Sequence, residues 1–222
     1  MNHQGITFPQ RKIKKNYRSI TGHFPSIKNN RSLAYESSLE ASLFLTLEFD
    51  KEVRSYMEQP QIQIQHNGKL KTYSADCHVK YHESSAKKDS IIEVKYTSEL
   101  EKDKDEFDQK FKSIQNATKE MNMKFILFTE QIFTDIYIKN LDFLYRYKTQ
   151  KISNRYDSQI LSAIKSPISA FDLANSLSKD KKDYFQIANS IWALVANNDL
   201  CADLHYEEIS MNTFVRKIDE CH

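Results

Sequence analysis

The sequence predicts a mixed α/β fold in which helices flank a sheet, followed by a smaller, mostly helical module. Two observations predict this order. Helix and strand patterns follow one another between residues 32 and 147, and after residue 150 three short helical segments are separated by polar breaks. Helices and strands that follow one another within one segment are typical of a layered α/β domain.

The first half of the α/β segment begins with a predicted helix and continues with strands. Residues 32–49 carry leucines on apolar faces and contain no glycine or proline, which predicts the helix. Pro60 then breaks the chain, because proline restricts the residue before it. Residues 61–65 alternate glutamine with isoleucine, which predicts a half-buried strand. An Asn-Gly turn leads to a returning strand over 71–81.

The second half contains the strand that we expect at the centre of the sheet. Residues 90–96 are apolar and β-branched, although one glutamate and one lysine interrupt this pattern. A highly charged helix is predicted over 98–121, a short buried strand over 124–129 and a further helix over 132–147. The order of elements therefore predicts a mixed sheet flanked by helices.

The segment after residue 150 predicts three short helices and a small β-ribbon. The helices are expected at 160–165, 170–177 and 184–195, and the ribbon at 204–206 and 213–215. Three helices followed by a ribbon suggest a winged-helix-like module.

The composition of the 222 residues excludes several classes of protein. The chain has three glycines, all far apart, so it lacks the clustered glycines of a P-loop or of a dinucleotide-binding turn. No apolar stretch approaches the length of a membrane span, and the N-terminus lacks the apolar core of a signal peptide. The three cysteines are an odd, sparse set, which favours reduced thiols and a cytoplasmic location.

Positive charge is concentrated at the N-terminus, although the net charge of the whole chain is only +2. Residues 1–35 hold seven basic residues and no acidic one, with aromatic residues between them. Such an arm suits contacts with DNA phosphates, and a solvated tail is the alternative. The basic residues expected to bind DNA are Arg11, Lys12, Lys14, Lys15 and Arg18.

One group of residues has the pattern of a metal-dependent nuclease. Asp76 and Glu93 are expected on adjacent strands, where both carboxylates can converge on one Mg²⁺, and the carbonyl of Val94 can supply a third oxygen. Side chains alternate along a strand, so Lys95 faces the same way as Glu93 and can orient or deprotonate a metal-bound water. Glu40, on the preceding helix, would complete the acidic cluster.

An alternative interpretation treats Glu93 and Lys95 as an ion pair at an exposed sheet edge. Against it, the apolar residues around them indicate an interior strand, where charges are costly unless they have a role. Acid-x-lysine occurs three times in the chain, but only this copy follows an apolar strand and has an aspartate at the end of the strand before it.

Several ordered motifs resemble the N-terminal domain of TnsA, the endonuclease subunit of a heteromeric bacterial cut-and-paste transposition system. The segments that carry the resemblance are 22–26, 35–40, 47–50, 58–60, 73–76 and 92–95. The chain departs from the family where Ala75 replaces a proline before the catalytic aspartate and where Cys77-His78 replaces a phenylalanine after it. Neither change removes a ligand.

The resemblance implies a restriction-endonuclease-like fold and a division of labour. Such a subunit cuts the 5′ ends of the transposon, while a TnsB-type transposase cuts and joins the 3′ ends and a TnsC-type AAA+ ATPase binds the C-terminal module. The catalytic roles of the family transfer to Glu40, Asp76, Glu93 and Lys95, with Glu36 as a reserve for Glu40. Mg²⁺, for which Mn²⁺ can substitute, would be held by Asp76, Glu93, Val94 and Glu40.

The resulting domain plan has a basic arm over 1–35, an endonuclease domain over 36–150 and a partner-binding module over 151–222. Two other functions stay open. One is a stand-alone restriction or repair nuclease of the same fold, and the other is a non-catalytic adaptor with vestigial acids. The sequence also leaves open whether a CRISPR guide or a protein targets the transposon.

Overall fold

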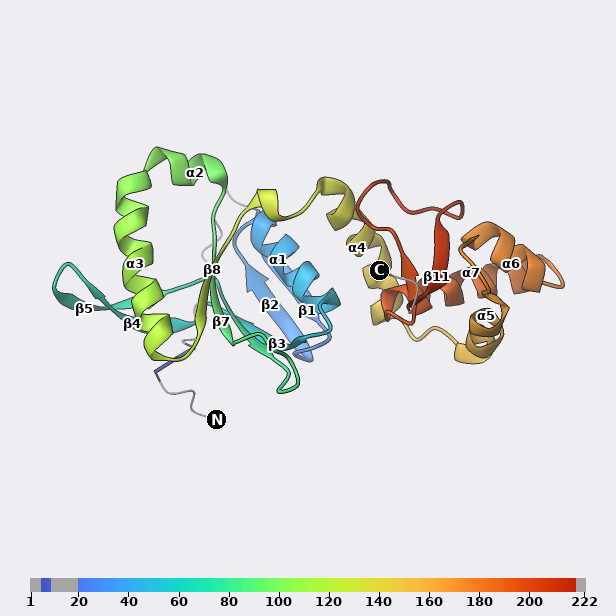
Figure 1. Cartoon of the computed structure of the whole chain (residues 1–222), viewed down its shortest axis with the longest axis horizontal. Coiled ribbons are helices and arrows are strands. Elements are labelled where there is room, and N and C mark those ends of the chain that lie inside the picture. Colours follow the sequence, from blue (N-terminus) through green and yellow to red (C-terminus); the bar gives the residue numbers. More distant parts are fainter. Residues whose placement is uncertain (1–4, 9–19, 219–222) are drawn as a thin grey trace. The chain divides into compact units, whose positions relative to one another are not determined.

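The computed structural model describes residues 5–8 and 20–218 of the chain, which Figure 1 shows. Contacts divide the chain into two compact units, Met1–Ile132 and Phe133–His222. The domain plan from the sequence placed residues 133–150 with the nuclease, whereas the structure groups them with the C-terminal unit. The difference arises because the helix in this segment packs on a C-terminal helix.

The first unit is built on a four-stranded mixed sheet, which confirms the predicted fold class. Its strands are β3 (Val53–Glu58), β6 (Cys77–Tyr81), β7 (Ser90–Val94) and β8 (Lys124–Phe128), in the spatial order β3-β6-β7-β8. β6 is antiparallel to both β3 and β7, and β7 is parallel to β8. β7 is therefore an interior strand, as its apolar sequence predicts.

Two hairpins accompany this sheet. One consists of β1 (Gly22–Ser26) and β2 (Arg31–Tyr35), and the other of β4 (Gln61–His66) and β5 (Lys69–Ser74). The predicted helix over 32–49 is therefore wrong in its first turn, because residues 32–35 pair with β1. The predicted strand over 71–81 is two strands, which belong to two different sheets.

The first unit also contains helices (Figure 1). They are α1 (Ser38–Phe49), α2 (Thr97–Lys102) and α3 (Lys104–Glu120), followed by the short 3₁₀ helix η1 (Glu130–Ile132). The single helix predicted over 98–121 is thus interrupted at Asp103. α1 contacts β1, β2 and β3, whereas α3 contacts β4 and β8.

The core under α3 places one face of β7 inside the unit. Ile114 of α3 and Ile91 of β7 are fully buried and belong to one cluster, against which Phe125 of β8 packs. Side chains alternate along a strand, so Glu93 projects from the same face of β7 as Ile91. The acid that the sequence singled out therefore lies on a packed face of an interior strand.

The second unit is mostly helical with a small sheet. Its helices are α4 (Asp135–Thr149), η2 (Asn154–Tyr156), α5 (Asp157–Ala163), α6 (Ala170–Leu177) and α7 (Lys181–Ala196). Its strands β9 (Ile168–Ser169), β10 (Leu200–Ala202) and β11 (Phe214–Lys217) are antiparallel in the order β10-β11-β9. The helix over 170–177 is confirmed, but the ribbon strand predicted at 204–206 is wrong, because β11 pairs with residues 200–202 instead. The small sheet also gains a third strand, β9. The winged-helix-like architecture stays a prediction.

The cysteines that the structure describes differ in state. Cys77 is buried and free, but Cys201 is disulfide-bonded, so the expectation of reduced thiols is wrong for Cys201. Among the residues that the structure describes, no helix has the length and apolar character needed to cross a membrane.

Candidate active site

Asp76 lies at the point where the chain leaves the β4–β5 hairpin and enters the central sheet. Backbone hydrogen bonds fix it on both sides: its N–H donates to the carbonyl of Ile92 at 3.1 Å, and its own carbonyl accepts from Gln59 N–H at 3.0 Å. Its Oδ2 accepts a hydrogen bond of 2.7 Å from the backbone N–H of Val94. The carboxylate is therefore held against the end of β7, beside Glu93.

Glu93 is buried, with 3% of its surface exposed, and both of its carboxylate oxygens have partners. Oε2 accepts a hydrogen bond from the hydroxyl of Tyr73. Oε1 lies 3.2 Å from Nζ of Lys95. A buried carboxylate is costly unless it is paired and hydrogen-bonded, and here both conditions are met.

Lys95 follows directly after β7, where its backbone N–H donates to the carbonyl of Phe128 at 3.0 Å. Its ammonium contacts Glu93 and also donates to the carbonyl oxygen of Val94 at 3.0 Å. The ion pair of the alternative interpretation is therefore present. It belongs to an interior strand, however, and not to the exposed sheet edge that this interpretation requires.

The electrostatics of the site follow from this burial. Desolvation and the neighbouring charge of Glu93 raise the pKa of Asp76 from its ordinary value to about 7. Burial of the Lys95 ammonium disfavours its charge, but the carboxylates of Glu93 and Asp76 outweigh this and raise the pKa of Lys95. The site thus holds more negative than positive charge, and a bound cation would offset this excess.

The donor set fits a magnesium ion. Asp76 and Glu93 offer carboxylate oxygens and Val94 offers a carbonyl oxygen, and Mg²⁺ binds few protein oxygens while keeping several waters. Among the described residues, no group of three or more His, Cys, Asp or Glu side chains is placed to hold a metal ion. Of the four expected ligands, the structure brings Asp76, Glu93 and Val94 together. A place for Glu40 among the ligands stays a prediction.

Glu40 has a second role that the sequence analysis did not identify. Ser37 caps α1: its Oγ accepts from Glu40 N–H at 3.1 Å, and Glu40 Oε2 in turn accepts from Glu36 N–H at 3.0 Å. This reciprocal arrangement resembles a capping box. Burial raises the pKa of Glu40, whose charge also acts on Asp76. Its participation in catalysis stays a prediction.

Two contacts at the site involve residues to which the sequence analysis gave no role. Tyr73 reaches Glu93 because the chain turns between β5 and β6. Tyr96 shares a 2.9 Å hydrogen bond with Ser38, which ties the N-terminus of α1 to the end of β7. The signal for Tyr73 was its position three residues before Asp76, but an unbroken strand over 71–81 would place the two side chains on opposite faces.

The basic arm cannot be compared with the structure. Arg11, Lys12, Lys14, Lys15 and Arg18 lie outside the described residues. Their contact with DNA stays a prediction.

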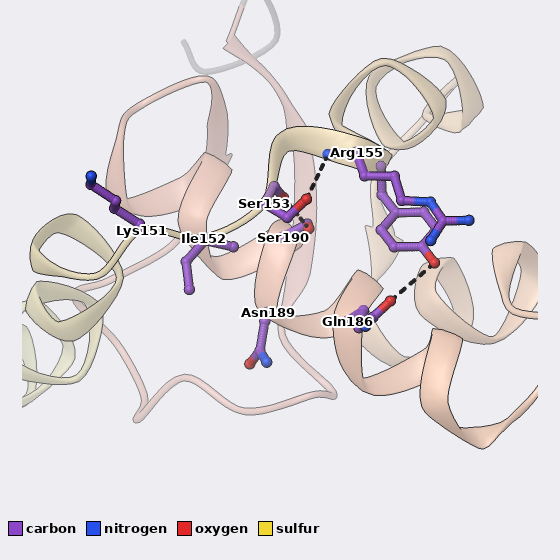
Figure 2. Close-up of a pocket in the computed structure, with 8 residues that line it drawn as sticks. Lys151, Ile152, Ser153, Arg155, Gln186, Asn189 and Ser190 are labelled. Carbon is purple, nitrogen blue, oxygen red and sulfur yellow. Dashed lines mark hydrogen bonds between the residues drawn. The ribbon is translucent and has the colours of Figure 1, made fainter.

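A separate polar pocket of about 250 Å³ lies in the C-terminal unit (Figure 2). Lys151 and Arg155 line it together with Ser153 and Asn189, and it contains no acidic residue. The hydroxyl of Ser190 donates to the backbone carbonyl of Ser153 at 3.3 Å, which joins the loop to α7. Without carboxylates the pocket lacks the ligands for the chemistry proposed at Asp76 and Glu93.

Comparison with known proteins finds a similarity over part of the first unit. No curated protein matches the chain. Residues 50–130 match the family model described as TnsA-like endonuclease N terminal. This segment includes Asp76, Glu93, Val94 and Lys95 but not Glu40. The region that carries the acidic site is thus similar to TnsA-like endonucleases, which supports a nuclease of the TnsA kind.

Proposed function

We propose that this chain is the endonuclease subunit of a Tns-type transposition system and hydrolyses the 5′ strand at the transposon ends with the help of Mg²⁺. One observation carries the proposal. Asp76, directly before β6, accepts a hydrogen bond from the N–H of Val94 at the end of the adjacent strand β7. Glu93 of β7 pairs with Lys95, and all four residues lie within the segment that matches TnsA-like endonucleases.

Each residue of the site has a distinct task in this reaction. A divalent cation, when bound, would activate a water and stabilise the charge that develops on the phosphate. Asp76, Glu93 and the carbonyl of Val94 would hold it. The N–H of Val94 and the hydroxyl of Tyr73 keep the two acids in place. Lys95 carries a proton at Nζ beside these oxygens, where it can orient the attacking water.

The partners follow from the same proposal. The 3′ ends would be cut and joined by a TnsB-type transposase, and a TnsC-type AAA+ ATPase would bind the C-terminal module. The basic arm would contact the DNA of the transposon end, because clustered Lys and Arg side chains gain affinity by releasing counterions from phosphates.

The test is a cleavage assay on transposon-end DNA with a 5′-strand label, run with and without the transposase and the ATPase. We expect cleavage that requires all partners, is supported by Mg²⁺ or Mn²⁺ and stops with a chelator. Asp76→Ala and Glu93→Ala should abolish it while calorimetry shows a folded protein. Glu83→Gln is the matched control, since it removes an exposed carboxylate of the first unit.

Two results would point to other functions. Efficient cleavage of DNA by the purified chain alone would favour a stand-alone restriction or repair nuclease. Unchanged cleavage in the Asp76 and Glu93 variants would show that the acids are not catalytic, as the adaptor interpretation requires.

A further inference from the structure

The ammonium of Lys95 contacts two of the oxygens that the proposed function assigns to the metal. Nζ is 3.0 Å from the carbonyl oxygen of Val94 and 3.2 Å from Oε1 of Glu93. The third proposed ligand is Asp76, whose Oδ2 accepts a hydrogen bond from the N–H of Val94. A positive charge of the chain itself therefore already contacts two of the three ligand groups.

The other donors at the two acids are fixed in place. Tyr73, which donates to Oε2 of Glu93, belongs to the core cluster under α3. The N–H of Val94, which donates to Asp76, is part of the backbone of an interior strand. Lys95 differs from both, because its side chain is 23% exposed and its ammonium sits on a flexible four-carbon stem. Of these three donors, Lys95 is the one that can move.

A metal ion and the ammonium cannot share these oxygens at low cost. Mg²⁺ lies about 2.1 Å from its ligand oxygens, so an ion on Oε1 of Glu93 would be no farther than about 5 Å from Nζ in its present position. At that separation two cations repel, and the repulsion is strong where burial lowers the dielectric constant.

We propose that Lys95 is a placeholder for the metal. Its ammonium holds Oε1 of Glu93 and the carbonyl of Val94 in the absence of a divalent cation, and it moves off both when the cation binds. The inference rests on the proposed function, because it takes these oxygens as ligands. Two consequences follow. The site keeps its geometry without metal, and the displaced ammonium becomes available to the substrate phosphate or the attacking water.

The proposed role of Lys95 predicts a change in metal affinity that can be measured without DNA cleavage. Removing the ammonium removes a competitor, so Lys95→Met should bind Mn²⁺ more tightly than the wild type, by about 10-fold. Lys95→Gln can donate hydrogen bonds without a charge and should lie between the two. Lys110→Met is the matched control: its ammonium lies 4.8 Å from the Tyr73 ring centroid, near the site but in contact with the ring.

Isothermal titration calorimetry of the full-length proteins with Mn²⁺ at pH 8, without DNA, measures these affinities. Circular dichroism checks that each variant is folded, and Lys95→Gln replaces Lys95→Met if the apolar side chain is not tolerated. We expect Lys110→Met to stay within about twofold of the wild type. Affinity in both Lys95 variants that is no higher than in Lys110→Met would overturn the placeholder.

A further variant separates this inference from the proposed function. Asp76→Asn should weaken Mn²⁺ binding strongly, because it removes a ligand charge. If Asp76→Asn binds like the wild type, or if no variant binds Mn²⁺, the metal site itself is absent and the proposed function fails. If binding depends on Asp76 but not on the charge at position 95, only the placeholder fails.

Discussion

The hydroxyl of Tyr73 donates a hydrogen bond to the buried carboxylate of Glu93, across 20 positions of sequence and from a different sheet. A second pair of the same kind lies elsewhere in the first unit, where the hydroxyl of Tyr56 donates to Glu48 at 2.7 Å. Glu48 is buried as deeply, with 2% of its surface exposed. One tyrosine thus supports an acid of the candidate site, and the other supports a buried acid of α1.

The two pairs permit a matched test of Tyr73. Tyr73→Phe and Tyr56→Phe each remove one donor from a buried carboxylate and leave it one other partner, which is Lys95 at Glu93 and Ser26 at Glu48. Each should therefore lower the free energy of unfolding by about 1–3 kcal/mol. Only Tyr73→Phe should also raise the Mg²⁺ concentration needed for half-maximal cleavage, by about 10-fold, because partners of metal ligands tune affinity. Denaturant unfolding and metal titrations of cleavage measure the two effects separately. Equal metal requirements in both variants would reduce Tyr73 to a structural residue.

The raised pKa of Asp76 makes the stability of the metal-free protein depend on pH. The folded-state pKa of about 7 exceeds the unfolded value of 3.8, so the group's contribution is fully present below pH 3.8 and is lost as the pH rises through 7. Asp76→Asn removes this loss. In a chelating buffer the free energy of unfolding of Asp76→Asn should exceed that of the wild type by an amount that grows between pH 5 and pH 8. The difference should reach the order of 1–4 kcal/mol.

Urea unfolding of both proteins at several pH values measures this difference. Saturating Mg²⁺ should abolish or reverse it, because the cation stabilises the ionised carboxylate of the wild type. A difference between the two proteins that does not vary with pH would show that Asp76 titrates normally in the folded state.

The sequence predicted the strands of the site better than the elements around them. The apolar residues around Glu93 are buried on both faces of β7, so their pattern identifies an interior strand on its own. β2 was misread as helix because residues 32–35 obtain their strand conformation from pairing with β1, a contact that a local pattern does not contain. Tyr73 was missed for a related reason: its contact depends on the break at Ala75-Asp76, where the chain passes from one sheet to another.

The two roles of Glu40 can be separated by a pair of substitutions. Glutamine keeps an oxygen that can accept from Glu36 N–H, so Glu40→Gln should change the free energy of unfolding by less than about 0.5 kcal/mol. Glu40→Ala loses this contact and should lower the free energy of unfolding by about 1 kcal/mol. If the charge serves catalysis, both variants should slow cleavage at least about 10-fold. Normal cleavage by Glu40→Gln would leave Glu40 with its capping role alone.

The division of the chain into two units predicts where it can be truncated. Leu141 and Leu144 of α4 are buried, and Phe143 packs edge-on against Trp192 of α7 at a centroid distance of 5.8 Å. A fragment of residues 1–132 should therefore fold cooperatively, whereas a fragment of residues 1–150 exposes the apolar face of α4 and should aggregate more readily. Calorimetry and light scattering compare the two fragments.

Pull-downs with the ATPase should show binding by the full chain and not by the fragment of residues 1–132. Equal binding by both would place the partner surface in the first unit.

Lys95 offers a test of what the protein contributes to transposition as a whole. If the transposase frees and joins only the 3′ ends, the 5′ strands stay attached to the donor DNA until this protein cuts them. Lys95→Ala leaves the oxygens of Asp76, Glu93 and Val94 in place but removes the group that orients the water, so cleavage should slow by about 10²–10⁴-fold. Integration should then continue through a branched intermediate, which replication converts into a cointegrate instead of a simple insertion. Long-read sequencing of integration products measures the ratio of the two, and Lys110→Met should leave that ratio at the wild-type value. An unchanged proportion of simple insertions in Lys95→Ala would mean that another protein makes the 5′ cut.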